Sequence, residues 1–252
     1  MEFVMLSGAK HPAHEILRFA QDDASSSFAD PDRVKQGWYL VARSDRARVA
    51  NTYHTEQRWG FLWVWLGDRR PFPLPDVDAR HQWTLPRQHV RAHPDIIFAN
   101  GFDLAHFAPS HQIEVATESL EIESPWRISH RIKGRLPRRP SLIFAGLDGA
   151  PIDATFTQYG GGIVHVRIRQ PIEYLIVFTI RPDANGHSRT QTILFLWRKR
   201  DIVAALALLW ATALDDIPLM ESIVWKPHFT PHDAVLEQYV HFIENMPQWR
   251  NG

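Results

Sequence analysis

A run of strand-like segments between Trp126 and Trp197 constrains the fold of this chain more than any other feature. β-Branched and aromatic residues, which favour strands, fill these segments, and turn-forming Gly, Pro, Asn and Asp separate them. In order, the segments read WRISHRIKG, TFTQYGGGIVHVRIR, IEYLIVFTIRP and RTQTILFLWRK, and the turn sequences DGAP and PDANGHS lie among them. Because short turns join strands that run in opposite directions, the sequence predicts four or five strands in an antiparallel meander.

Helical patterns flank this meander on both sides. The segment Asp95–Phe107 carries apolar residues at helical spacing, and Pro109 should end that helix by removing a backbone donor. A longer apolar run, AALALLWATALDDIPLMESIVW, follows Asp201, whose side chain is suited to cap a helix N-terminus. One short helix, a group of strands and one long helix predict an α+β domain whose long C-terminal helix packs on a curved sheet.

The N-terminal part of the chain divides into segments of different character. Residues 1–34 mix Ser, Ala, Asp and His without periodicity, so we expect a weakly ordered leader. Two strand-like segments, GWYLVARS and RWGFLWVWLGD, fall within 35–70 and should share one sheet. The following segment, RRPFPLPDVD, alternates proline with other residues and can neither continue a helix nor pair fully in a sheet. We therefore predict a boundary there and a main domain at 71–252.

Composition excludes several classes of function. The chain has no cysteine, which rules out disulfides, thiolate zinc sites, cysteine nucleophiles and cysteine-ligated iron–sulfur clusters within it. Basic and acidic residues are equal at 28 each, so no excess positive charge favours nucleic acid or an anionic membrane surface. The N-terminus lacks a secretory-signal pattern, and the apolar run Ile202–Leu214 is shorter than the about 20 residues that span a bilayer. We expect a cytoplasmic protein.

The residues most suited to chemistry lie in one short segment. Asn100, Asp103, His106 and His111 bring two imidazoles and a carboxylate close together in sequence. A break in the helix near Pro109 could turn the second imidazole back towards the first. Two neutral imidazoles and one carboxylate on one face of an octahedral metal form the facial triad of non-haem Fe(II) oxygenases. The sequence therefore predicts a metal site that still needs a carboxylate from elsewhere.

The long C-terminal helix offers that carboxylate. Asp215 and Asp216 interrupt an otherwise apolar stretch, and a buried carboxylate needs a charged partner such as a metal ion. Pro218 should disturb the helix beside them, and Glu221 is a weaker candidate one turn away. The residue types alone do not choose between Asp215 and Asp216.

Simpler interpretations of these residues stay open at this point. Histidines at a helix end are often solvent-exposed or packed in a core, and paired aspartates often mark a solvated helix break. Arg135, Arg138 and Arg139 resemble a solvated loop. The histidines without metal-ligand spacing are interpreted as structural, namely His93, His130, His165, His187, His228 and His232.

Three motifs in this order resemble the catalytic domain of the Rieske-type ring-hydroxylating oxygenases. The N-x-x-D-x-x-H-x-x-x-x-H motif of that family is matched in full by the segment from Asn100 to His111. Its C-terminal ligand segment, an Asp followed five residues later by Glu, is matched by Asp216 and Glu221. The segment RWGFLWVWLGD is similar to the strand that closes the family's Rieske domain. The resemblance covers roughly residues 37–225.

The resemblance implies a ligand set and a fold. His106, His111 and Asp216 would bind Fe(II), and Asp103 matches the bridging acid that couples the iron to a Rieske cluster on a neighbouring subunit. Asn100 matches an active-site asparagine. The implied fold is a helix-grip (START/Bet v 1-like) domain, commonly assembled as a trimer, with residues 35–70 as the truncated remnant of a Rieske-type β domain.

The absence of cysteine departs from the family pattern, because a Rieske cluster needs two cysteines and two histidines. The family includes catalytic subunits without their own cluster, in some purine N-demethylase systems, which receive electrons from a separate Rieske protein. The resemblance thus implies a non-haem Fe(II) oxygenase subunit that uses O2 and a separate Rieske ferredoxin and reductase. It would hydroxylate or oxidatively demethylate a small hydrophobic or heteroaromatic substrate, as a mono- or dioxygenase.

Two other functions fit the same residues. A ligand-binding or scaffolding remnant could have lost its chemistry together with the cluster. A zinc hydrolase could use the same His and Asp ligands, because both also suit zinc.

Overall fold

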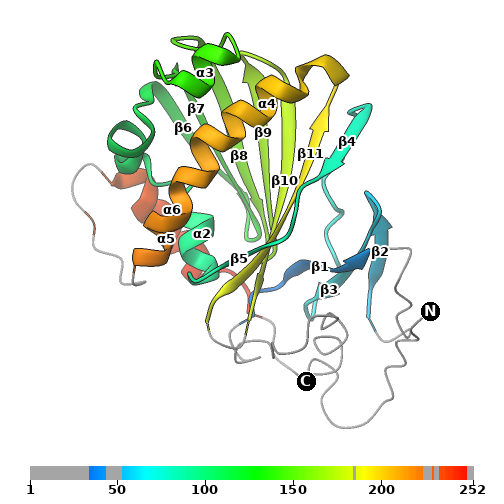
Figure 1. Ribbon diagram of the computed structural model, residues 1–252. Coiled ribbons are helices and arrows are strands. Elements are labelled where there is room, and N and C mark those ends of the chain that lie inside the picture. The colour runs from blue at the N-terminus through cyan, green and yellow to red at the C-terminus, as the bar shows by residue number, and fades with distance from the viewer. Residues whose placement is uncertain (1–33, 44–52, 184–185, 224–228, 230–232, 249–252) are drawn as a thin grey trace.

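The computed structural model of this chain describes residues 34–43, 53–183, 186–223, 229 and 233–248 (Figure 1). The expected leader at 1–34 lies outside these residues except for Val34, as do His228 and His232.

Two antiparallel sheets make up the β structure. The smaller sheet has the order β1-β3-β2 and comprises β1 (Gly37–Arg43), β2 (Thr55–Arg58) and β3 (Phe61–Leu66). The larger, eight-stranded sheet has the order β4-β11-β10-β9-β8-β7-β6, and β5 also pairs with β11. Its strands are β4 (His81–Thr84), β5 (Gln88–Val90), β6 (Glu114–Ser124), β7 (Arg127–Arg135), β8 (Pro151–Tyr159), β9 (Ile163–Gln170), β10 (Tyr174–Pro182) and β11 (Ser188–Leu196). The predicted antiparallel meander is confirmed from β7 to β11, and β6 extends it by one strand.

The large sheet has more strands than the sequence predicted. β6 carries several glutamates and lacks a strong strand propensity, so it was missed, as were the short strands β4 and β5. The predicted single segment TFTQYGGGIVHVRIR is two strands, β8 and β9, joined at a glycine turn. Gly160 adopts a φ of +59°, and a Cβ there would lie 2.7 Å from the carbonyl oxygen of Gln36. Glycine is therefore needed both for the turn and for the close approach of the two sheets.

The predicted helix Asp95–Phe107 is wrong in length. α2 spans only Pro94–Ala99, and the chain then forms a 3-10 turn at Leu104–His106, η2, and a π-helical turn at Phe107–His111, η3. Asp103 starts η2, because its carboxylate accepts a hydrogen bond from the Ala105 backbone N–H at 3.1 Å. A short polar side chain that bonds its own backbone in this way competes with a continuous helix.

The predicted long helix is confirmed, with a more complex course. A 3-10 turn, η4 (Lys199–Asp201), leads into α4 (Ile202–Leu209), a π-helix, η5 (Trp210–Leu214), and α5 (Asp215–Ser222). Asp201 directly precedes α4 but makes no capping hydrogen bond; its carboxylate instead accepts from Arg198 at 2.7 Å. A further helix, α6 (Ala234–Glu244), follows and was not predicted, so the long helix is not the last one.

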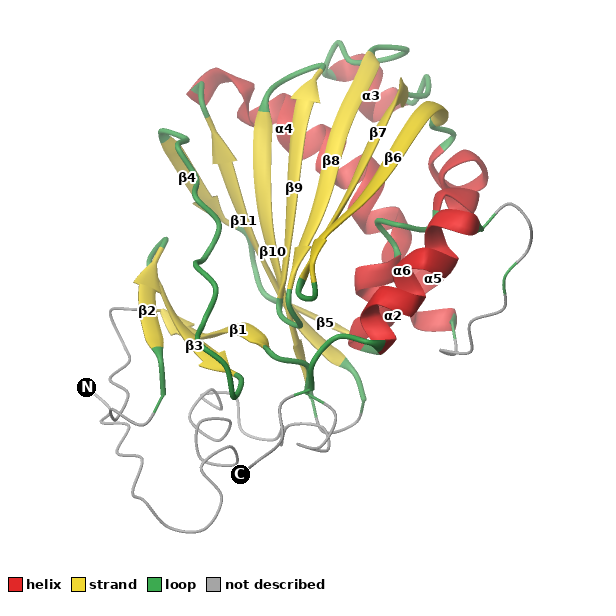
Figure 2. Ribbon diagram, turned by 180° about the vertical axis from the view of Figure 1, so that it is seen from behind, coloured by secondary structure: helices red, strands yellow, loops and turns green. Residues whose placement is uncertain are grey.

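The two faces of the large sheet pack against different parts of the molecule. Along β10, Tyr174 and Ile176 pack with residues of α4, whereas Leu175 and Val177 pack with the three-stranded sheet. Side chains alternate between the faces of a strand, so a strand covered on both faces becomes apolar throughout. α4 accordingly crosses one face of the sheet in Figure 1, and Figure 2 shows α2, α5 and α6 gathered at one side.

A second core lies where α2 and α6 meet the sheet. Tyr239 of α6 is fully buried, stacks on Phe102 with ring centroids 4.2 Å apart, and donates to Gln158 Oε1 at 2.8 Å. α6 therefore supports the segment after α2, which is the segment that carries the predicted metal ligands.

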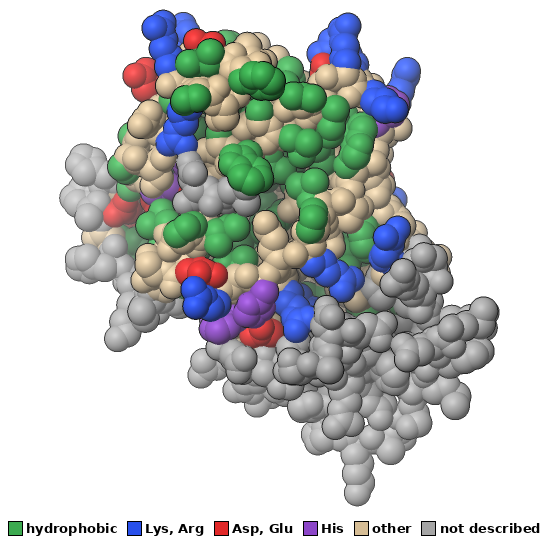
Figure 3. Space-filling view, viewed as in Figure 1, with side chains coloured by type: hydrophobic (Ala, Val, Ile, Leu, Met, Phe, Trp, Pro, Cys, Tyr) green, Lys and Arg blue, Asp and Glu red, His purple; other side chains and the backbone are tan. Residues whose placement is uncertain are grey.

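The helical stretch Lys199–Ser222 has 24 residues and a mean hydropathy of 1.7, long and apolar enough to cross a membrane by length and composition alone. A single helix of this kind is weak support for a span, because core helices of soluble proteins pass the same test. Here Ala205, Leu208 and Ala211 pack against the large sheet. The opposite side of the helix exposes Trp210, and apolar side chains gather on this face of the molecule (Figure 3).

Candidate metal centre

His106 and His111 are the last residues of two consecutive turns. His106 ends η2 and His111 ends the π-helical η3, which contains Pro109. Gln112 then leaves the turn in the left-handed region, with a φ of 56°. The two imidazole rings lie with centroids 5.2 Å apart at 74° to each other. The irregular turns thus bring together two imidazoles that a regular helix would point in different directions.

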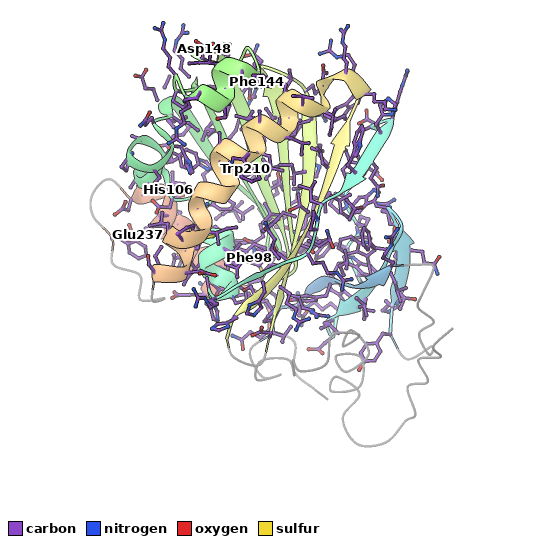
Figure 4. All side chains as sticks on the ribbon, viewed as in Figure 1. Phe98, His106, Phe144, Asp148, Trp210 and Glu237 are labelled. Atoms are coloured by element: carbon purple, nitrogen blue, oxygen red, sulfur yellow. The ribbon has the colours of Figure 1, made fainter. Side chains whose placement is uncertain are left out.

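Asp216 of α5 completes the group. Its Oδ1 lies 2.8 Å from His111 Nε2 and 3.9 Å from His106 Nε2, and one ligand atom from each residue fits within 4.8 Å of the others. All three residues are buried, with exposed fractions of 8%, 3% and 5% for His106, His111 and Asp216. Figure 4 shows His106 beside the long helix, below Trp210.

Pro218 accounts for the local shape of the helix that carries Asp216. Proline has no N–H, so the carbonyl of Leu214, four residues earlier, lacks its helical donor, and the ring crowds that carbonyl. The π-helix η5 ends at Leu214, directly before α5. A π segment adds a residue to the turn and rotates the next part of the helix about its axis, and such segments are common at functional sites.

Several ligand atoms lack hydrogen-bond partners. Within the described residues, both ring nitrogens of His106, Nδ1 of His111 and Oδ1 of Asp216 are buried without a hydrogen bond. The approach of His111 Nε2 to Asp216 Oδ1 is therefore short without hydrogen-bonding geometry. Buried polar atoms without partners are costly, and nitrogen and carboxylate lone pairs that converge in this way suit a divalent cation. The group is consistent with a mononuclear non-haem iron site.

Two further predicted residues lie behind the ligands. Asn100 Nδ2 donates to Asp216 Oδ2 at 2.6 Å, which orients the carboxylate and leaves Oδ1 facing the histidines. Asp103 Oδ2 lies 3.6 Å from His106 Nδ1, and its side chain is 32% exposed. Polar groups of this kind orient metal ligands and are nearly as important as the ligands themselves.

Glu221, the weaker candidate carboxylate, is paired with Arg91 instead of the histidines. Glu221 accepts hydrogen bonds from the Arg91 backbone and guanidinium at 3.0 Å each, and the side-chain bond to Arg91 holds the pKa of Glu221 below its usual value. The side chain of Asp215 lies outside the described residues. Asp216, one of the two aspartates left open by the sequence, lies beside the histidines.

Sequence reasoning missed a contribution from Arg139, which had been interpreted as part of a solvated loop. Its guanidinium is partly buried and donates to the carbonyl of Ser110 at 2.5 Å and to that of Ala211 at 3.3 Å. Ser110 lies in η3 and Ala211 in η5, so one side chain joins the two π-helical segments next to His111 and Asp216. The positions of these residues in the sequence do not indicate that they are in contact.

His130 is buried close to the same segment. Its exposed fraction is 0%, its Nδ1 lies 3.1 Å from the Gly101 carbonyl, and burial lowers its pKa, partly offset by that contact and by Glu118. The burial of His130 could have been inferred from the sequence, because His130 alternates with Ile128 and Ile132 along β7 and residues two apart share a face of a strand.

Asn100→Ala should lower the Fe(II) affinity of the chain by about 10- to 100-fold, the usual effect of losing a polar partner of a metal ligand. The substitution removes the 2.6 Å hydrogen bond that orients Asp216. Competition titration with a chelator would measure the change. Asn245→Ala is a matched control, because that exposed amide bonds only the turn of α6 around His241 among the described residues. Equal affinities of the two variants would contradict the orienting role.

Comparison with known proteins identifies one distant relative by sequence and solved structures of similar fold. No family model matches the chain. Aminopyrrolnitrin oxygenase PrnD from Pseudomonas fluorescens is 30% identical over 118 residues, which are 44% of this chain and 31% of that protein. The match thus spans about a third of the length of this relative.

Solved structures match over more of the chain. A dicamba monooxygenase bound to dicamba aligns with a TM-score of 0.57 and 15% identity, over 76% of this chain and 68% of that one. NdmA from Pseudomonas putida CBB5, in a mutant form with theobromine, aligns with a TM-score of 0.56 and 14% identity, over 79% and 63%. The chain therefore has the fold of Rieske oxygenase catalytic subunits such as these, and it is a distant homologue of aminopyrrolnitrin oxygenase PrnD.

Proposed function

We propose that this chain is the catalytic subunit of a non-haem Fe(II) oxygenase that hydroxylates or oxidatively demethylates a small hydrophobic or heteroaromatic substrate. The observation that carries the proposal is the buried group of His106, His111 and Asp216, whose ligand atoms converge without hydrogen-bond partners among the described residues. The fold shared with dicamba monooxygenase and NdmA supports it.

Each polar residue has a defined task in this proposal. His106, His111 and Asp216 would hold Fe(II), which when bound supplies the activation of dioxygen. Asn100 keeps the Asp216 carboxylate turned towards the histidines. Asp103 has a partly exposed side chain and lies 3.6 Å from His106 Nδ1, so the proposal assigns it to the route by which electrons would reach the site from a redox partner. The chain has no cysteine, so the electrons would come from a separate Rieske ferredoxin and reductase.

Aromatic side chains lie beside the group. Phe107 packs edge-on against His106 at 4.7 Å between ring centroids, and Phe156 lies 6.3 Å from Phe107. A substrate beside these rings would be apolar or aromatic, because a polar molecule would lose its hydration there without gaining partners. Dicamba, caffeine and theobromine, which occupy structures of the same fold, are suitable first compounds to test.

Further parts of the proposal concern organisation. We propose that residues 71–252 form a helix-grip catalytic domain and that the three-stranded sheet within 35–70 is the truncated counterpart of a Rieske-type domain. We also propose a homotrimeric or hetero-oligomeric assembly in the cytoplasm. Size-exclusion chromatography with light scattering would measure the assembly.

The test combines metal content with turnover. The full chain, loaded anaerobically with Fe(II), should consume O2 in the presence of substrate, a Rieske ferredoxin and its reductase, and His106→Ala should abolish both O2 uptake and the binding of iron at this group. His241→Ala, an exposed histidine on α6, is the matched control and should retain both. Binding of zinc with hydrolysis and no O2 uptake would overturn the proposal in favour of a hydrolase. Substrate binding without iron binding or turnover would overturn it in favour of a binding remnant.

A further inference from the structure

A second group of metal-ligand residues lies away from the candidate iron site. It consists of His89 on β5, Asp183 directly after β10 and His187 directly before β11. β5 pairs with the start of β11, where His89 lies opposite Arg189. The strand pairing thus brings His89 next to the β10–β11 turn, although it is 94 residues from Asp183 in the sequence.

The three side chains are close enough to share one ion. His89 Nε2 lies 2.8 Å from Asp183 Oδ2, the rings of His89 and His187 have centroids 5.4 Å apart, and one ligand atom from each residue fits within 4.8 Å of the others. Histidine, acidic and basic side chains are seen together near the lower ends of β10 and β11 in Figure 3.

The turn holds two of these residues in place. The Asp183 N–H donates to the His187 carbonyl at 2.9 Å, and the His187 N–H donates to Asp183 Oδ1 at 3.1 Å. Asp183 is buried, with an exposed fraction of 3%. Its carboxylate is therefore fixed by the backbone of the turn and still has Oδ2 directed at His89.

His187 supplies an independent sign of a missing partner. Its Nδ1 is buried and has no hydrogen-bond partner among the described residues. A buried ring nitrogen without a partner is costly. An ion shared with His89 and Asp183 would provide one.

We propose that His89, Asp183 and His187 form a second divalent-cation site, of the type that takes Zn²⁺. Zinc binds nitrogen and carboxylate oxygen at about 2.0–2.2 Å, so neighbouring ligand atoms around a tetrahedral ion are roughly 3.4 Å apart. The pair of His89 and Asp183 needs to open only slightly from 2.8 Å to reach that spacing. Without the ion, a hydrogen bond in the same place keeps the two ligands together.

The ligand chemistry selects the kind of ion. Two imidazoles and one carboxylate suit zinc and its neighbours, whereas Ca²⁺ and Mg²⁺ prefer sites made of oxygen ligands. Arg189 lies opposite His89 in the strand pairing, and Arg181 lies opposite Arg189. Two basic residues are thus close to the site. Positive neighbours weaken the binding of any cation, which further disfavours hard ions held by charge alone.

The site would tie β5 to the end of the β10–β11 hairpin. β5 precedes α2, whose C-terminal end leads to Asn100 and the candidate iron ligands. A cation at the hairpin would therefore stabilise the start of the segment that builds the first site, without taking part in its chemistry.

Counting bound ions in variants of the full chain tests the proposal. Metal-stripped protein is dialysed against Co²⁺, which substitutes for both zinc and Fe(II) and can be followed by its visible absorption. The wild type should bind about two ions per chain, and His89→Ala and His187→Ala about one each. His89 is half exposed, so its replacement should leave the fold intact, and His241→Ala is the matched control that should still bind about two.

The outcomes separate this site from the candidate iron site. His106→Ala should also bind about one ion, and the double variant with His187→Ala about none. If His89→Ala and His187→Ala bind as many ions as the wild type, the second site is disproved, whatever His106→Ala does. If His106→Ala keeps the wild-type count while His89→Ala and His187→Ala each lose an ion, the second site stands and the proposed function fails.

Discussion

Asp216→Ala will lower the Fe(II) affinity of this chain by more than about 100-fold, beyond the range expected when only a supporting partner is lost. Asp216 contributes the carboxylate that lies 2.8 Å from His111 Nε2, and without it two neutral imidazoles remain. Neutral ligands alone do not offset the desolvation of a divalent cation as well as a charged one does. O2 uptake should fall to the level of the metal-free protein.

Asp215→Ala is the matched control, because it removes the neighbouring carboxylate from the same helix. It should leave the Fe(II) affinity close to that of the wild type. Chelator competition measures both affinities, and circular dichroism of the metal-free proteins shows whether each variant is folded. The assignment fails if Asp215→Ala loses the ion and Asp216→Ala keeps it.

Trp63→Ala should destabilise the protein by about 3–5 kcal/mol, as expected for a large aromatic side chain lost from a core. Trp63 is fully buried, and its indole N–H donates to the Arg58 carbonyl at 3.1 Å. It packs in the core that joins the three-stranded sheet to the large sheet, beside Val177 and Ile193. The cavity left by alanine would lie at the junction of the two sheets.

Urea unfolding or a thermal melt would measure this loss; each kcal/mol corresponds to about 2–4 °C for a chain of this size. Trp210→Ala is the matched control, because that side chain is 66% exposed, and its effect should stay within about 0.5 kcal/mol. An unchanged melting temperature for Trp63→Ala would mean that the small sheet adds nothing to the stability of the large one.

Periodicity and motif explain the features that the sequence could predict. The meander and the long helix follow from strong local patterns, and the aromatic and β-branched residues of RWGFLWVWLGD predicted the strand around Trp63. Local patterns failed where tertiary contacts override them. β6 is glutamate-rich yet pairs with β7 along its length, and the turn at Asp103 cuts short a segment that has helical spacing.

The candidate site shows the same limit. The spacing of His106 and His111 indicated a metal site, but only resemblance to a family favoured Asp216 over Asp215, because two adjacent residues differ by helix phase alone and a π-helix shifts that phase. The contacts of Arg139, and the meeting of His89 with His187, join residues far apart in sequence. His89 meets His187 through strand pairing, and Arg139 reaches its partners through the packing of helical segments; single-residue patterns encode neither.

The contacts of Arg139 have a consequence for how such a centre can change. One guanidinium spans the carbonyls of Ser110 and Ala211, so it acts as a spacer that sets the width between the two ligand-bearing segments. A lysine ammonium is a compact point charge and could not span both carbonyls with a planar fork. In the proposed metal centre, the size of ion that fits would thus be adjustable from a residue that does not touch the ion.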